Sequence, residues 1–313
     1  MRLAEICIDG RSRFGSLAVW SEAEKGWLFI SDLFKQVKSP KDTRYLSAGL
    51  MLYRNSSYDD KDVDVDDIRR ALSAYEAKHL GKAKAYKPGV DGSEYATLYN
   101  SPSKILCVGL NYADHAKEFG DPLPTEPVIF NKAPSAVNYC GGTIVLPKSS
   151  SKVDYEGELV IVIGDRCRDV EPKNALKYVA GYCCGNDVSA RDWQKEKPAG
   201  QWFLGKSFDS FAPIGPAFVS ADEVGDPNNL KIETRLNGEV VQSSNTSNFI
   251  FKPDFLVSYL SKIMTLYTGD LIFTGTPGGV GDARKPPRYL KQGDFVEVEI
   301  EKVGVLRNKV GIY

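Results

Sequence analysis

The sequence predicts a β-rich α+β fold with a small N-terminal α/β part, and three observations support this prediction. Short β-type runs recur from residue 104 onward, helical patterns are few, and no repeat period or low-complexity tract is present. With 313 residues, of which 42% are hydrophobic, the chain can bury a large core. We therefore expect an N-terminal unit with a linker over residues 1–100 and a larger unit over residues 101–313.

The N-terminal unit shows strand and helix patterns in turn. Residues 1–35 alternate in strand fashion around turns, and Asp62–Leu80 predicts a helix whose leading acids complement the helix dipole. The passage 81–103, broken by Pro88 and Pro102, predicts a linker. Because the first residues alternate and carry acids, unlike a signal or transit peptide, we expect a cytoplasmic protein.

The larger unit consists of short apolar or alternating runs separated by turn residues. Asn237-Gly238, between two alternating runs, is a strong hairpin signal. We expect helices at residues 173–182, 189–197 and 253–264. The expected strands cover residues 105–110, 127–130, 143–146, 154–164, 212–219, 230–241, 270–276 and 295–300.

Composition narrows the class of partner. Lys and Arg number 40 against 41 Asp and Glu, so the formal charge of -1 gives no electrostatic case for nucleic acid or an anionic membrane. No apolar run approaches the roughly 18 residues that span a bilayer. Six cysteines without a C-x-x-C pair predict reduced, buried thiols, and neither a zinc site nor a disulfide framework. We expect a small-molecule partner.

Two glutamates lead into the most apolar run of the chain. Side chains at i and i+2 of a strand share a face, so Glu156 and Glu158 point the same way. The run 159–164 that follows is apolar, which predicts a buried strand. Ionised carboxylates in a core are costly unless a cation or hydrogen-bond donors compensate them, so the pair predicts a metal ion. The alternative is a solvated strand end beside lysines.

A third carboxylate, Asp187, follows the apolar run 182–184 and precedes an expected helix. A strand end there can bring Asp187 to Glu156 and Glu158. Three oxygen ligands favour a hard ion, magnesium, manganese or calcium, over zinc or copper, and leave positions for substrate and water. The alternative is that Asp187 caps the helix that starts near Ser189.

One of the two histidines of the chain also stands near an acid. Glu118 follows His115 by three residues, so the two side chains would share a helical face. A carboxylate beside an imidazole can set its tautomer and hold a water molecule, which makes a general-base pair. The alternative is an ordinary surface pair, and the spacing does not distinguish the two.

Five motifs occur along the chain in a fixed order. They are I-L-C-V-G-L-N-Y-A-D-H-A-K-E, V-D-Y-E-G-E-L, G-N-D-V-S-A-R-D-W-Q, L-G-K-S-F-D-S-F-A-P-I-G-P and F-T-G-T-P-G-G-V-G. Together they resemble the fumarylacetoacetate hydrolase family, over about residues 101–313, and especially its fumarylacetoacetate hydrolase domain-containing proteins. The resemblance implies a mixed β-sandwich roll, with a metal in a cleft of the roll, and a homodimer.

The resemblance also assigns roles to the carboxylates and the histidine. It implies that Glu156, Glu158 and Asp187 bind magnesium or manganese, which is the set of ligands that the residues themselves predict. It implies that His115 and Glu118 form a dyad that activates water.

Further roles follow from the resemblance alone. Lys206 matches a lysine near the metal. Arg191, Gln194 and Thr276 match positions that contact carboxylate or carbonyl oxygens of the substrate, and the rigid fork of an arginine suits a carboxylate. The loop 275–279 is alternatively a turn between strands.

The implied chemistry acts on 2-keto acids, which chelate a divalent ion and form a stabilised enolate. We expect a magnesium- or manganese-dependent hydrolase that cleaves a C–C bond in an acylpyruvate-type 2,4-diketo acid, because the dyad of His115 and Glu118 suits a reaction that uses water. One alternative is an oxaloacetate keto-enol tautomerase or decarboxylase. Another is a catalytically inactive, metal-stabilised binding module. The proteins that the sequence resembles include mitochondrial ones, so a mitochondrial location is the alternative to the cytoplasm.

Overall fold

The computed structural model describes residues 1–7, 16–30, 32–33, 65–78, 83–88, 94–95, 102–114 and 123–312. Over this part of the chain the fold is mostly β, with mixed sheets and some short helices. This agrees with the β-rich class that the sequence predicts. The finer description, a sandwich-like roll with a separate N-terminal domain, stays a prediction.

The largest sheet joins the N-terminal strands to the centre of the fold. In spatial order it contains β4 (Ala85–Tyr86), β3 (Gly26–Phe29), β2 (Ser16–Ser21), β1 (Arg2–Cys7), β14 (Ala212–Ser220), β12 (Val179–Asn186), β11 (Gly157–Ile163), β17 (Leu271–Phe273), β6 (Ile105–Gly109) and β7 (Val128–Lys132), with β5 (Glu94–Tyr95) beside β1 and β8 (Val137–Tyr139) beside β14. Because β1 pairs with β14, hydrogen bonds of one sheet cross the expected boundary near residue 100. Whether the two units are separate domains stays a prediction.

Two smaller sheets complete the β structure of the described residues. One has the order β16 (Glu239–Asn245), β15 (Lys231–Leu236), β18 (Phe295–Ile300), β19 (Gly304–Gly311) and β9 (Thr143–Val145), and the other pairs β10 (Val153–Asp154) with β13 (Ser189–Ala190). The hairpin predicted between β15 and β16 is confirmed. Asn237 and Gly238 have φ values of 54° and 82°, the left-handed conformation that a tight hairpin turn requires.

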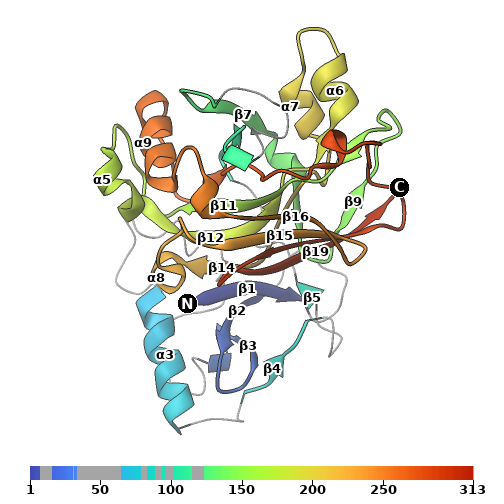
Figure 1. Cartoon of the computed structure of the whole chain (residues 1–313). Coiled ribbons are helices and arrows are strands. Elements are labelled where there is room, and N and C mark those ends of the chain that lie inside the picture. The colour runs from blue at the N-terminus through green and yellow to red at the C-terminus, as the bar shows by residue number, and fades with distance from the viewer. Residues whose placement is uncertain are drawn as a thin grey trace.

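Most helices lie around the sheets (Figure 1). They are α3 (Val65–Lys78), α5 (Pro172–Ala175), α6 (Arg191–Glu196), α7 (Trp202–Lys206), α8 (Ala221–Val224) and α9 (Pro253–Ile263), with 3-10 turns at Pro134–Ala136, Leu176–Tyr178, Thr246–Asn248 and Gly281–Ala283. The helices expected over 62–80 and 253–264 correspond to α3 and α9. Among the described residues, no helix is long and apolar enough to cross a membrane.

Two expected helices are wrong in part. The segment expected over 173–182 leaves the helical conformation after Tyr178, because the residues from Val179 onward pair with β11 and β14 as β12. Gly181 permits this close pairing, since a Cβ there would lie 2.1 Å from the carbonyl oxygen of Val219. The helix expected from residue 189 begins at Arg191, because the two preceding residues pair with β10.

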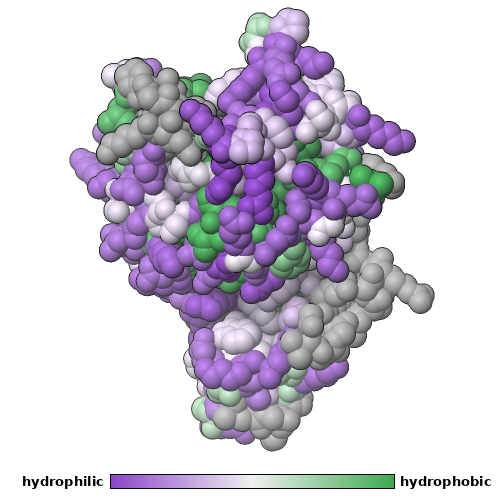
Figure 2. Space-filling model, turned by 45° about the vertical axis from the view of Figure 1, so that its right-hand side comes forward, coloured by the Kyte–Doolittle hydropathy of each residue, from purple (hydrophilic) through white to green (hydrophobic). Residues whose placement is uncertain are grey.

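Strand β11 lies at the centre of the core. Val160 and Val162 pack into one hydrophobic cluster, and Leu159, Ile161 and Ile163 pack into another on the opposite face. Burial on both faces explains why this run is continuously apolar. The outer surface differs: Figure 2 shows a face that is mostly hydrophilic, with hydrophobic residues gathered near its middle.

The predicted buried thiols are confirmed for the cysteines that the structure describes as free, Cys107, Cys140, Cys167, Cys183 and Cys184.

Candidate metal centre

Three carboxylates meet at one end of the β11–β12 pair. Glu158 lies in β11, Glu156 directly precedes that strand, and Asp187 directly follows β12. The antiparallel register places Gly157 opposite Asn186, which brings the three acids to the same place. One oxygen of each lies within 4.8 Å of the others. The sequence predicted this convergence, and metal binding by the three acids stays a prediction.

The alternatives for these acids do not fit the structure. Glu156 and Glu158 are 7% and 1% exposed, so they do not form a solvated strand end. Asp187 does not cap the following helix, because α6 begins at Arg191 and its N-cap is Ala190. The acids are therefore held in the interior by the sheet.

Two buried lysines contact the acids. Lys206 Nζ donates to Glu156 Oε2 and to Asp187 Oδ2, each at 2.8 Å. Lys132 Nζ donates to Asp187 Oδ1 at 2.5 Å and to the Val188 carbonyl at 3.1 Å. Lys206 was a candidate in the sequence and Lys132 was not. A lysine that ends a strand usually faces water, yet Lys132 is the one buried residue of β7.

An arginine and a further acid join the site to neighbouring segments. Arg191 Nη2 lies 2.7 Å from Glu156 Oε1 and 2.8 Å from Asp154 Oδ2, and Arg191 Nη1 donates to Gln194 Oε1 at 2.9 Å. Asp154 also accepts the backbone N–H groups of Gly281 and Asp282, at 2.8 and 3.0 Å. Asp154, which the sequence did not single out as a site residue, therefore holds α6 against the turn at 281–283.

The electrostatics of the acids fit a hard divalent cation. Glu158 accepts the N–H of Gly275 at 2.7 Å. Burial, followed by the charges of Asp187 and Glu156, raises the pKa of Glu158 well above its ordinary value. A donor set made only of carboxylate oxygens suits magnesium or manganese, and a divalent charge there would remove the cost of ionising all three acids. The residues present therefore fit the ion that the sequence predicts.

Lys206 stays charged in spite of its burial. Burial by itself lowers the pKa of an ammonium group, but the charges of Asp187 and Glu156 outweigh this and raise the pKa of Lys206. Its Nζ also lies 4.9 Å from the centre of the Phe130 ring. Lys206 is therefore a charged hydrogen-bond donor beside the carboxylates.

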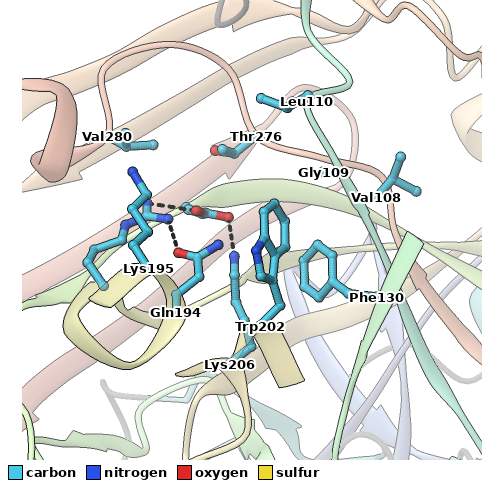
Figure 3. Close-up of a pocket in the computed structure, with 12 residues that line it drawn as sticks. Val108, Gly109, Leu110, Phe130, Gln194, Lys195, Trp202, Lys206, Thr276 and Val280 are labelled. Carbon is cyan, nitrogen blue, oxygen red and sulfur yellow. Dashed lines mark hydrogen bonds and ion pairs between the residues drawn. The ribbon is translucent and has the colours of Figure 1, made fainter. Parts of the chain in front are cut away.

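A cavity of about 200 Å³ opens next to this cluster (Figure 3). The rings of Trp202 and Phe130 form one wall, edge to face, with centroids 5.2 Å apart. Figure 3 shows Gln194 and Lys195 across from these rings. The cavity is lined by Val108, Gly109, Leu110, Phe130, Glu156, Arg191, Gln194, Lys195, Trp202, Lys206, Thr276 and Val280. Neither Trp202 nor Lys195 is among the candidate site residues that the sequence predicts.

Thr276 lines the cavity as the family resemblance implies. Its hydroxyl donates to the Gly157 carbonyl at 3.0 Å and accepts from Gln242 Nε2 at 2.8 Å. Residues 275–279 also lie in the connection between two strands, as the alternative expected, because β17 ends at Phe273 and β18 begins at Phe295. The structure thus places Arg191, Gln194, Thr276 and Lys206 at one cavity, and their roles toward a substrate stay predictions.

His115 and Glu118 lie outside the described residues. The segment that leads to them is held beside the cavity: Asn111 Nδ2 donates to the Thr274 and Phe251 carbonyls, at 2.7 and 3.0 Å. Leu110 lines the cavity itself. The dyad stays a prediction.

Comparisons with known proteins cover the same part of the chain. Residues 104–311 match the family model described as fumarylacetoacetate (FAA) hydrolase C-terminal. The mitochondrial oxaloacetate tautomerases FAHD2A of Bos taurus and Homo sapiens are 53% and 51% identical to this chain over 209 residues, which are 67% of this chain and 67% of each relative. The fumarylacetoacetate hydrolase domain-containing protein 2 homolog of Dictyostelium discoideum is 53% identical over 218 residues, 67% of this chain and 72% of that protein.

Solved structures show the same fold. The fumarylacetoacetate hydrolase from psychrophilic Exiguobacterium antarcticum superposes with a TM-score of 0.79 and 36% identity, over 100% of both chains. The fumarylpyruvate hydrolase from Pseudomonas aeruginosa, in complex with Mn²⁺ and pyruvate, has a TM-score of 0.62 and 35% identity over 67% of this chain and 90% of that one. Every candidate site residue described above lies within the matched residues 104–311.

Proposed function

This chain belongs to the fumarylacetoacetate hydrolase family, and from that membership we propose that it is an enzyme that interconverts the keto and enol forms of oxaloacetate. The observation that carries the proposal is the buried cluster of acids, lysines and arginine at a cavity of about 200 Å³, which suits a small, doubly acidic substrate. Relatives named oxaloacetate tautomerases, 51–53% identical over 209 residues, favour this activity over the C–C hydrolysis expected first.

Glu156, Glu158 and Asp187 would hold a magnesium or manganese ion. When bound, such an ion supplies Lewis acidity that favours the enolate form of a 2-keto acid. The manganese in the Pseudomonas aeruginosa relative supports the choice of ion. On the side of the cluster that faces the cavity, the substrate would contact Lys206, Arg191 and the residues of the cavity wall.

Tautomerisation needs a base, and a donor at the oxygen where charge develops. The C3–H bond breaks, its electron pair becomes the C2–C3 double bond, and the C2 oxygen takes up a proton. Lys206, charged and facing the cavity, would donate to that oxygen as it becomes negative. We propose the His115 and Glu118 dyad as the base, because the preceding Leu110 lines the cavity.

Substrate orientation falls to the polar side chains of the cavity. Arg191 carries a rigid fork that suits a carboxylate, and it is held by Asp154 and Glu156. Gln194 and Thr276 would contact the remaining carboxylate or carbonyl oxygens. The aromatic wall of Trp202 and Phe130 offers no charge, so it would pack against the flat carbon chain of an enol.

Hydrolysis of an acylpyruvate is the second candidate. The Pseudomonas aeruginosa fumarylpyruvate hydrolase, with its bound pyruvate, is the observation that favours it. In that reaction the same dyad would activate a water molecule that attacks the C4 carbonyl, and pyruvate would leave. Decarboxylation of oxaloacetate uses the same enolate without a water nucleophile.

Proton NMR of enol-oxaloacetate distinguishes these activities. With the magnesium-loaded chain, we expect the enol signal of freshly dissolved oxaloacetate to decay faster than in buffer, with no pyruvate formed from acetylpyruvate or fumarylpyruvate. Lys206→Met should slow the decay by about 100-fold, because a donor at the developing charge is lost. Lys177→Met, at a lysine outside the cavity, is the matched control. Pyruvate from a diketo acid, without faster enol decay, would replace the tautomerase with the hydrolase.

Assembly and location are also proposals. We propose a homodimer on the family resemblance. The names of the bovine and human relatives include the word mitochondrial, which supports a mitochondrial location for this chain as an alternative to the cytoplasm.

A further inference from the structure

Helix α6 presents three polar side chains to the cavity at different depths. Arg191, Gln194 and Lys195 are spaced i, i+3 and i+4, so they share one face of the helix. Arg191 and Gln194 are buried, whereas the side chain of Lys195 is 47% exposed. In Figure 3, Lys195 extends past Gln194 toward Val280. The cavity therefore has a cation at its rim as well as cations at its floor.

The cations at the floor lie among the acids of the cluster and, in the proposed function, contact the C1 carboxylate and the C2 oxygen. Lys206 contacts Glu156 and Asp187, and Arg191 contacts Asp154 and Glu156. The aromatic wall carries no charge. Among the residues that line the cavity, Lys195 is the cation most exposed to water, so it is the one best placed for a charged group that points outward from the floor.

Lys195 is held at the rim by an ion pair that is open to water on the lysine side. Its Nζ lies 2.6 Å from Asp282 Oδ2, and the two side chains are 47% and 16% exposed, so water reaches the ammonium group while Asp282 is mostly covered. Asp282 has other contacts: Tyr289 Oη donates to its Oδ1 at 2.6 Å, and its backbone N–H donates to Asp154. Asp282 would therefore stay in position when Lys195 turns toward a ligand.

We propose that Lys195 binds the C4 carboxylate of a dicarboxylic 2-keto acid, and that it thereby selects dicarboxylates over monocarboxylates. The inference rests on the proposed function, because it assumes that the C1 carboxylate and C2 oxygen lie at the floor. The four-carbon chain then directs its second carboxylate toward the rim. Lys195 acts as a specificity-determining residue, without a part in proton transfer.

The test compares two substrates that differ only in that carboxylate. 2-Oxobutyrate has a methyl group where oxaloacetate has its C4 carboxylate, and exchange of the C3 protons with deuterium can be followed by NMR for both. The magnesium-loaded full chain is used, as wild type and as Lys195→Met. Lys197→Met is the matched control, since Lys197 belongs to the same segment, stacks on Trp193 and does not line the cavity.

We expect Lys195→Met to lower kcat/KM for oxaloacetate by about tenfold, mainly through a higher KM, because one half-exposed charged contact is lost. The kcat/KM for 2-oxobutyrate should stay within about twofold, and Lys197→Met should leave both values within about twofold. Lys195→Arg, which keeps the charge, should restore most of the preference for oxaloacetate.

Four outcomes would overturn the inference, the last of them together with the proposed function. An equal loss for both substrates in Lys195→Met would show a structural role for Lys195, and unchanged kinetics would show none. A rise in the KM for oxaloacetate in Asp282→Asn as large as in Lys195→Met would show that the Lys195–Asp282 pair, and not a released ammonium group, matters. A wild-type chain that exchanges neither substrate would instead overturn the proposed function, and the inference with it.

Discussion

The charged cluster at the end of β11 and the contact between α3 and α8 use the same types of residue in opposite environments. In the cluster, the side chains of Lys132 and Asp187 are both 0% exposed. At the second contact, Arg69 and Asp222 lie 2.7 Å apart but are 41% and 63% exposed. Water screens the charges of the exposed pair, whereas only protein groups compensate the charges of the buried pair.

This difference indicates that the buried cluster holds charge for a purpose other than stability. Exposed ion pairs form at little cost in free energy. A buried cluster of acids and bases loses its hydration, and apolar residues at the same positions would not have this desolvation cost. Four acids of the cluster, Asp154, Glu156, Glu158 and Asp187, stand against Lys132, Lys206 and Arg191. Such an arrangement is expected at a functional site.

The largest expected effect comes from removing the buried cation that the sequence did not reveal. Lys132→Met should lower the free energy of unfolding of the metal-free chain by about 3–5 kcal/mol, because Asp187 would lose a fully buried partner. Urea unfolding with the metal removed measures this. The same variant should bind manganese at least as tightly as wild type, since a competing positive charge is gone. A decrease in the free energy of unfolding below about 1 kcal/mol would contradict the comparison, because the buried pair would then contribute no more than an exposed one.

A smaller change in stability, with a large change in binding, is expected at Glu158. Glu158→Gln should lower the affinity for magnesium or manganese by about 100-fold, because one charged oxygen ligand is replaced. Stability of the metal-free chain should stay equal or rise, because like charges at Glu156 and Asp187 no longer oppose Glu158. Titration calorimetry and urea unfolding on the same preparation check both. Marked destabilisation of the metal-free variant would show that Glu158 is a structural acid.

The smallest effect is expected at the exposed contact. Arg69→Met should change the free energy of unfolding by less than about 1 kcal/mol and leave the decay of enol-oxaloacetate unchanged. Thermal unfolding at low and high salt, together with the NMR assay, measures this. A loss of activity would extend the functional region to the N-terminal strands and α3.

The convergence of the three acids could be expected from the sequence, because it depends on spacing within one strand and on the position of an acid at a strand end. Glu156 and Glu158 share a strand face by their spacing, and Asp187 stands at a strand end. Lys132 could not be predicted as a site residue in the same way. Lys132 reaches Asp187 across 55 positions of the chain, through the pairing of β6 with β7 and with β17, which no local pattern encodes.

The secondary structure shows the same limit. The alternation around Asn237 gave the correct hairpin because a turn and its two strands are adjacent in the chain. Residues 179–182 were expected as the end of a helix, since a short apolar run fits a helix or a buried strand equally. Pairing with β11 and β14, both distant in sequence, decides in favour of the strand.

Titration of the full chain with Mn²⁺ after removal of metals tests the central claim most directly. If Glu156, Glu158 and Asp187 form the metal centre, calorimetry should show one tight site per chain in the wild type, weakened by about 100-fold in Glu158→Gln and unchanged in Arg69→Met. Equal manganese affinity in the wild type and Glu158→Gln would contradict the account, because the buried acids would then serve a purpose other than metal binding.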